Sequence, residues 1–195
     1  VGLPLGVLSA VKRGTVWDFA GRTFALFGQA LPPFWIGLVL ILIFSVQLGW
    51  LPTSQRGGID HYILPSITLG WLAAAGLLRL VRSSMLEVLG SEYVKLARAK
   101  GVRGRVVIWK HAFRNALITP LTFASLLMVG FLTGTVVTES VFAWPGLGRL
   151  TVEAINNNDF PLMTGSVMVF VVMYVGVMFM LDVTYALLDP RIRNR

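Results

Sequence analysis

Residues 160–181 read FPLMTGSVMVFVVMYVGVMFML and contain no Lys, Arg, Asp or Glu. An α-helix rises about 1.5 Å per residue, so about 20 apolar residues cross the hydrocarbon core of a bilayer, which is about 30 Å thick. A single apolar run can also form a buried helix of a soluble protein. The length and uniform apolarity of this run indicate a membrane span.

Three further windows contain no charged residue, namely Thr23–Gln55, His61–Leu78 and Asn115–Thr138. The chain has 195 residues, of which 55% are hydrophobic and 13% charged. An ordinary soluble domain has about 45–50% apolar and about 25% charged residues. Because one soluble core cannot hold this excess, we expect an all-α integral membrane protein, a polytopic helical bundle with four full spans.

The first residues, VGLPLGVLSAV, are apolar but too short to cross a bilayer. Their charges, Lys12 and Arg13, follow the apolar run, whereas a secretory signal places its charges first. We interpret this segment as the end of an earlier span and residues 1–195 as a single, N-terminally incomplete transmembrane domain. The absence of Cys excludes disulfides and thiolate metal sites within these residues.

The charges alternate between the connections. Lys and Arg collect in the cytoplasmic loops of membrane proteins. Residues 79–114 hold nine Lys/Arg against two Glu, a net charge of +7, and residues 11–22 and 189–195 are also net basic. The connections at about 51–63 and 138–161 carry net charges of 0 and −2, so we expect them to be external.

This alternation predicts a multi-pass protein of the cell (inner) membrane with a cytoplasmic C-terminus. It also accounts for the net charge of +8 and the pI near 10.6, so we expect no nucleic-acid partner.

The long cytoplasmic loop, at about 82–114, carries more charge than topology requires. Residues 86–101 are rich in helix formers, and Gly101 ends the run. On a helix, Val94, Ala97 and Gly101 share one face, where small residues allow another surface to approach closely. The alternative is an amphipathic helix on anionic membrane lipid. The small residues favour docking onto a protein partner.

Longer motifs resemble a known family. EYVKLARAKGV (92–102) with KHAFRNALITPLT (110–122) is similar to the cytoplasmic coupling loop of dipeptide/oligopeptide-type permeases, the membrane subunits of binding-protein-dependent ABC importers. TESVFAWPGLGRLTVEAINNNDFP (138–161) resembles the outer loop of that family, and DVTYALLDPRIR (182–193) its last span and tail. The resemblance covers almost the whole chain.

The resemblance implies the fold of a type I ABC importer permease. It also implies a second homologous permease, two cytoplasmic ATPase subunits and an extracytoplasmic substrate-binding protein as partners. Di- or oligopeptides are the implied cargo, although relatives carry nickel complexes, glutathione or sugars. The chain contains no GxxxxGK[ST] motif, so we expect no enzymatic activity and no bound cofactor, with ATP and Mg on the partner ATPase.

The resemblance also implies site residues. Importers of the wider superfamily begin this loop pattern with Glu-Ala-Ala, whereas here the triplet is Leu96-Ala97-Arg98 and the nearest acid is Glu92, which leaves open which acid, if any, contacts the ATPase. The ATPase-coupling set is Glu92, Tyr93, Val94, Ala97, Arg98, Ala99, Lys100, Gly101, His111, Arg114 and Asn115.

An external set could line a gate or contact the binding protein, or it could equally anchor the loop at the membrane interface. It comprises Phe142, Trp144, Pro145, Gly146, Leu147, Gly148 and Arg149.

Isolated candidates point to little further chemistry. Asp182 lies at the edge of an apolar run, where an ionisable group suggests function, but we favour a structural role because no second acid or His accompanies it. His61 and His111 fall in loops on opposite sides, so we predict no metal site. A stand-alone channel or ion-coupled transporter is the alternative of a different class, and it would be expected to carry intramembrane charges and broken helices.

Overall fold

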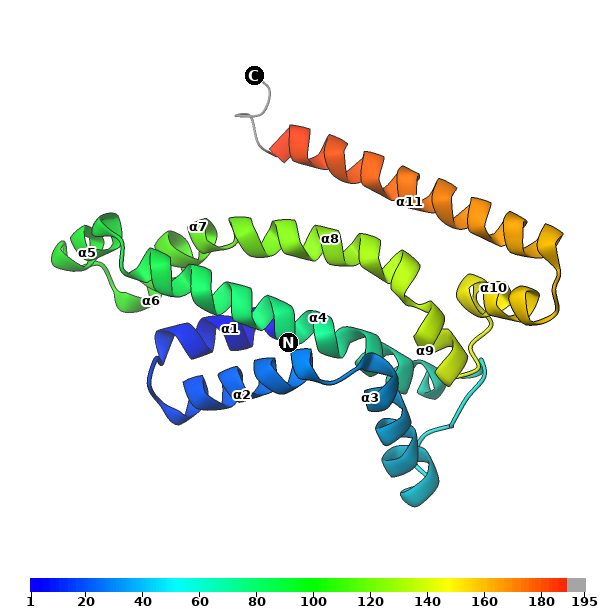
Figure 1. The fold of residues 1–195 in the computed structure, drawn as a ribbon. Helices are drawn as coiled ribbons and strands as arrows, with labels where there is room; N and C mark the ends of the chain where they lie inside the picture. Colours follow the sequence, from blue (N-terminus) through cyan, green and yellow to red (C-terminus); the bar gives the residue numbers. More distant parts are fainter. Residues whose placement is uncertain (189–195) are drawn as a thin grey trace. The chain divides into compact units, whose positions relative to one another are not determined.

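The computed structural model describes residues 1–188, except for the side chains at 129, 132–134, 181, 182 and 184–188. These residues form two compact units (Figure 1), residues 1–32 with 70–124 (unit 1) and residues 33–69 with the described chain from 125 (unit 2). The helices are α1 (Gly2–Val11), α2 (Val16–Ala30), α3 (Pro33–Leu40), α4 (Asp60–Leu89), α5 (Glu92–Ala99), α6 (Gly104–Val106), α7 (Arg114–Ala116), α8 (Ile118–Gly134), α9 (Val136–Val141), α10 (Leu147–Asn156) and α11 (Phe160–Leu188), with π-helical segments η1 (Ile41–Gln47) and η2 (Val107–Phe113).

No strand occurs in the described part of the chain, and the predicted all-α membrane fold is confirmed. Two of the four charge-free windows lie within single long helices, α4 and α11. By length and hydropathy these two helices can each cross a bilayer alone. α2 and the Pro33–Gln47 segment, which are bent by 105° relative to each other, count as a third span only if the bent pair is taken as one span.

The other two windows are divided between consecutive helices. Thr23–Gln55 begins in α2 and continues in α3 and η1. Pro32 ends α2, because the preceding Leu31 is extended and Pro32 cannot donate the next helical hydrogen bond, and Pro33 starts α3. Asn115–Thr138 is divided at Leu117 and Thr135, so α8 has only 17 residues. Pro120 lies in the first turn of α8, where the missing backbone N–H of a proline is tolerated.

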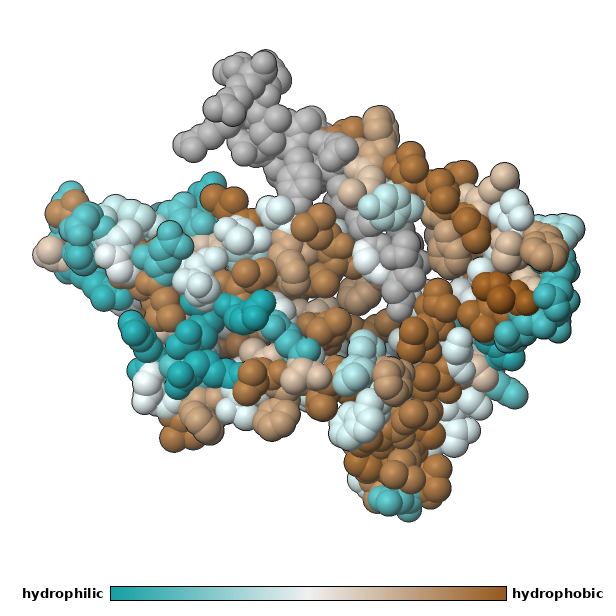
Figure 2. All heavy atoms as spheres, viewed as in Figure 1, coloured by the Kyte–Doolittle hydropathy of each residue, from teal (hydrophilic) through white to brown (hydrophobic). Residues whose placement is uncertain are grey.

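The surface of α11 explains why the chain needs a membrane or a partner subunit. Only 6% of its most apolar window is buried within the described structure, although that window has a mean hydropathy of 2.1. Figure 2 shows hydrophobic side chains over α3 and along much of α11. Apolar area of this extent in water would oppose folding as a soluble monomer.

Unit 1 contains the core on which the basic loop rests. Small side chains of α1 pack against α4 and η2, and Gly6 allows α1 to approach α4, since a Cβ there would lie 2.7 Å from the Val81 Cβ. The buried members of this core are Val7, Ala10, Val81, Met85, Ala112 and Ala116.

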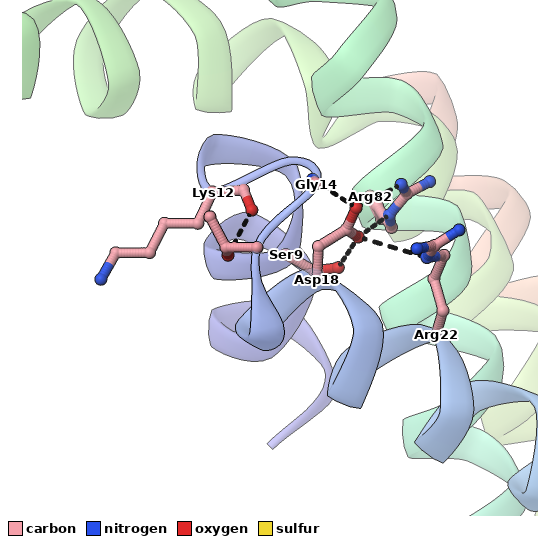
Figure 3. A network of polar contacts seen from close by, with 7 residues as sticks. Ser9, Lys12, Gly14, Asp18, Arg22 and Arg82 are labelled. Carbon is pink, nitrogen blue, oxygen red and sulfur yellow. Dashed lines mark hydrogen bonds and ion pairs between the residues drawn. The ribbon is translucent and has the colours of Figure 1, made fainter.

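A buried carboxylate connects the α1–α2 turn to α4 (Figure 3). Only 2% of the Asp18 side chain is exposed, and its Oδ1 accepts hydrogen bonds from Ser9 Oγ (2.8 Å) and Arg82 Nε (2.7 Å). Its Oδ2 accepts from the Gly14 N–H (3.0 Å) and Arg82 Nη2 (3.1 Å). Arg22 Nε lies farther away, 3.7 Å from Oδ1. The bidentate, charge-assisted geometry with Arg82 makes this a strong polar contact.

We predict that Arg82→Met destabilises the protein by about 3 kcal/mol, because it leaves the buried Asp18 charge without its main partner. The double variant Asp18→Asn/Arg82→Met should recover part of this loss, since the remaining carboxamide is neutral. Thermal unfolding of the full-length protein in detergent measures both effects.

Arg13→Gln is the control for this prediction, because Arg13 is exposed and its substitution removes the same charge. Its stability should change by less than about 0.5 kcal/mol. An Arg82→Met variant as stable as Arg13→Gln would show that the Asp18 network contributes little.

Candidate functional site

The predicted coupling helix is observed as α5, which is shorter than the 86–101 run. That run is divided at Gly90 and Ser91, where α4 ends and α5 begins. Val94 is fully buried, while Tyr93 Oη donates a hydrogen bond to the His111 carbonyl (3.3 Å). Asn115 Nδ2 donates to both Tyr93 Oη (2.9 Å) and the His111 carbonyl (3.0 Å). These contacts fix α5 against η2 and the start of α7.

Gly101 does not lie on the helical face expected for it. α5 ends at Ala99, and Gly101 follows with φ +75°, a left-handed conformation that favours glycine. The Gly101 N–H donates to the Arg98 carbonyl (3.0 Å) and the Val102 N–H to the Ala97 carbonyl (3.2 Å). This is a Schellman C-cap. A Cβ at Gly101 would meet no atom within 4 Å, so its backbone conformation, not close packing, favours glycine here.

The exposed side of α5 is cationic. Arg98, Ala99 and Lys100 are exposed and Ala97 is half-buried. The helix thus has one buried side, at Val94, and one exposed side that a partner can contact. Lys95 Nζ lies 2.7 Å from the Glu92 carboxylate, and both side chains are mostly exposed. The structure therefore brings Tyr93, His111 and Asn115 together, buries Val94, and leaves the positive charges near the end of α5 exposed, with Arg114 on the neighbouring α7 also exposed.

The external set surrounds a turn within unit 2. Phe142 is 2% exposed, and its carbonyl accepts a hydrogen bond from the Gln55 N–H (2.9 Å). The Trp144 ring stacks edge-on against Tyr62, with 4.7 Å between the ring centroids. Gly37 on α3 makes room for Phe142, since a Cβ there would lie 3.2 Å from that ring. The aromatic residues of this set thus hold the loop to α3, to α4 and to the 51–59 connection.

Glu139 on α9 organises the same turn, a role that the net charge of the 138–161 connection does not reveal. Its carboxylate accepts a hydrogen bond from the Arg149 N–H (2.9 Å), the third backbone amide of α10, and so caps that helix. A Cβ at Gly146 would collide with this carboxylate, and one at Gly148 would lie 2.7 Å from the Val136 Cα. The Pro-Gly-Leu-Gly spacing after an acid could have indicated this close contact.

Arg149 has two further partners within the loop. Its Nη1 donates to the Ala143 carbonyl (2.6 Å), at a residue with φ +47°, and its Nε donates to Glu153 (2.7 Å). These contacts use two of the three guanidinium nitrogens of Arg149, Nε and Nη1. Pro145 is exposed, while Leu147 is half-buried.

The isolated candidates His61 and Asp182 lie outside both of these residue sets. His61 Nδ1 lies 3.0 Å from the Gln55 carbonyl, a contact that ties the helix start to its own loop. Among the described residues, no group of three or more His, Cys, Asp or Glu is arranged to hold a metal ion. The side chain of Asp182 and the basic tail at 189–195 lie outside the described residues.

The chain is similar to several peptide-type permeases. It is 38% identical over 222 residues to the di/tripeptide transport system permease protein DppB of Pseudomonas aeruginosa (strain UCBPP-PA14), covering 100% of this chain and 66% of that protein. It is 43% identical over 194 residues to the glutathione transport system permease protein GsiC of Pectobacterium atrosepticum and 41% identical to GsiC of Escherichia coli K12, in both cases covering 100% of this chain and 63% of the relative. The chain thus spans slightly less than two thirds of the length of these relatives.

The family described as "Binding-protein-dependent transport system inner membrane component" matches residues 2–194, which is nearly the whole chain. This match confirms the resemblance drawn from the 92–122 and 138–161 motifs. The chain belongs to the family of binding-protein-dependent transport system inner membrane components.

Proposed function

We propose that this chain forms, with a second homologous permease, the translocation path of an ATP-driven importer of di- and oligopeptides. Two cytoplasmic ATPase subunits supply the energy by hydrolysing ATP with Mg, and an extracytoplasmic binding protein delivers the cargo. The 82–114 loop and the C-terminus face the cytoplasm, and the 51–63 and 138–161 loops face outward. This topology follows from the distribution of Lys and Arg.

The geometry of α5 carries this proposal. Its Val94 side is buried and its Tyr93 hydroxyl is hydrogen-bonded to η2, so α5 and the helix that follows can move as one body. Its other side presents Arg98 and Lys100 to a partner. A force applied by an ATPase to this exposed side would reach α7 and α8 through the Tyr93–Asn115 hydrogen bond.

Glutathione is a second candidate cargo, because the chain is 41–43% identical to glutathione permeases and 38% identical to a di/tripeptide permease. Glutathione is itself a tripeptide, so one path could accept either class. Competition between a labelled dipeptide and glutathione in cells with the complete transporter separates the two cargoes.

Affinity purification of the full-length protein in mild detergent tests the assembly. We expect an ATPase and a second, similar permease to co-purify with it. Recovery of the protein alone or as a homo-oligomer would contradict the importer assembly and favour a stand-alone channel or ion-coupled transporter.

We predict that Gly101→Leu uncouples transport while the protein still inserts into the membrane. Gly101→Ala should have a similar effect, because the left-handed conformation disfavours any Cβ by about 1–2 kcal/mol and no neighbour contributes a clash. Gly101→Asn should be milder, since Asn tolerates this conformation. An uptake assay measures transport, stimulation of the ATPase measures coupling, and membrane fractionation measures insertion.

Gly104→Ala is the matched control, because its Cβ also meets open space and its φ is not positive. It should keep wild-type uptake and ATPase stimulation. Wild-type uptake and ATPase stimulation in Gly101→Leu would contradict the proposed role of α5 in transmitting force from the ATPase.

Arg98→Gln and Lys100→Gln should weaken ATPase co-purification more than membrane insertion, because both side chains are exposed and charges at an interface contribute to partner attraction. Arg103→Gln removes an exposed charge outside the coupling set and serves as the control. Quantitative co-purification at two salt concentrations measures the effect. Equal recovery from all three variants would argue against docking through the end of α5.

For the outer loop, Glu139→Ala should lower uptake and leave ATPase co-purification unchanged. The substitution removes the cap of α10, which we expect to cost about 1 kcal/mol of local stability. Glu153→Ala is the control, because Glu153 forms only an exposed i,i+4 ion pair with Arg149, typically worth about 0.3–0.5 kcal/mol. Full uptake by Glu139→Ala would exclude a transport role for the ordered turn.

A further inference from the structure

Unit 1 contains a pocket that the transport proposal does not use. It lies between α2 and α4 and has a volume of about 330 Å³, within the range of about 300–1,000 Å³ of ligand sites. Its polar lining includes Arg22, Arg79, Arg82 and Gln29, and its apolar lining includes Leu26 and Leu78.

The pocket is net positive. Three guanidinium groups line it, and the nearby carboxylate of Asp18 compensates only one of them, mainly through Arg82. Figure 3 shows the guanidinium groups of Arg22 and Arg82 beside Asp18, contributed by α2 and α4. Within the described part of the chain, Arg79 is exposed and forms no ion pair. Two positive charges therefore remain available to an anion.

The position of the arginines along the helices indicates the depth of the pocket in the membrane. Arg22 directly precedes the charge-free window Thr23–Gln55, and Arg79 directly follows the window His61–Leu78. Both side chains thus mark the boundary between apolar and polar sequence, where lipid phosphates lie. Leu26 and Leu78 belong to the apolar sides of these boundaries and line the same pocket.

We propose that this pocket binds the phosphodiester headgroup of an anionic phospholipid, with Arg22 and Arg79 contacting the phosphate and the leucines contacting the first part of an acyl chain. Basic pockets between membrane helices bind acidic headgroups in this way. The adjoining leucines favour a lipid over free phosphate, because free phosphate has no apolar part. Arg82 is already engaged by Asp18 and acts as a positioning residue.

Native mass spectrometry of the full-length protein in neutral detergent tests the site, with phosphatidylglycerol and phosphatidylcholine as probes. We expect phosphatidylglycerol to bind more tightly. Arg79→Gln should weaken its binding about fivefold, the effect of one basic residue near an acidic lipid surface, and Arg22→Gln should act similarly. Arg79→Lys keeps the charge and should retain most of the affinity.

Arg105→Gln is the control, because Arg105 is exposed and does not line the pocket. It should bind phosphatidylglycerol as the wild type does. Thermal unfolding without lipid checks that each variant is folded, and we expect Arg79→Gln to unfold at the wild-type temperature.

Three outcomes would overturn the proposal. The first is wild-type phosphatidylglycerol binding by the double variant Arg22→Gln/Arg79→Gln. The second is an equal loss in Arg105→Gln, which would indicate diffuse attraction to the whole basic surface. The third is displacement of phosphatidylglycerol by an equal concentration of inorganic phosphate, which would make free phosphate the ligand.

Discussion

The bidentate contact between Asp18 and Arg82 is the constraint on which the arrangement of unit 1 depends. A carboxylate that is 2% exposed requires compensation, and Arg82 supplies two hydrogen bonds from α4, while Ser9 supplies one from α1 and Gly14 one from the α1–α2 turn. The contact therefore fixes the positions of α1, α2 and α4 relative to one another within unit 1. The core beneath it uses small side chains such as Ala10 and Ala112, which offer little shape specificity of their own.

Both candidate sites depend on glycine, for different physical reasons. Gly101 has a positive φ and open space around it, so it ends α5 and turns the chain through a Schellman cap. Gly146 and Gly148 instead lie where a side chain would collide with Glu139 or Val136. In the coupling loop, glycine fixes the end of a helix, whereas in the outer loop it allows a carboxylate to reach the N-terminus of α10.

The exposed apolar faces fit an inner membrane component of this family. The most apolar window of α11 is almost unburied within the described chain, so lipid or another protein must cover it. Polar contacts, in contrast, concentrate at the ends of the long helices, in the Asp18 network and around Glu139. This division leaves α11 free to contact a bilayer or a neighbour, whereas a third of the most apolar window of α4 is buried within the described chain, at 33%.

The sequence by itself determined the fold class, the basic loop and the family, because hydrophobic runs and charge alternation reflect the cost of placing charges in hydrocarbon. It also identified Gly101 as the residue that terminates the helical run, two residues beyond the last residue of α5. It did not place the break at Ser91 or divide Thr23–Gln55 into separate helices, because helix-forming composition or hydropathy alone describes each run as one helix. Only the tertiary structure paired Asp18 with Arg82, 64 residues apart, and joined Tyr93 to Asn115, because hydrogen bonds between distant side chains leave no periodic signal in a single sequence.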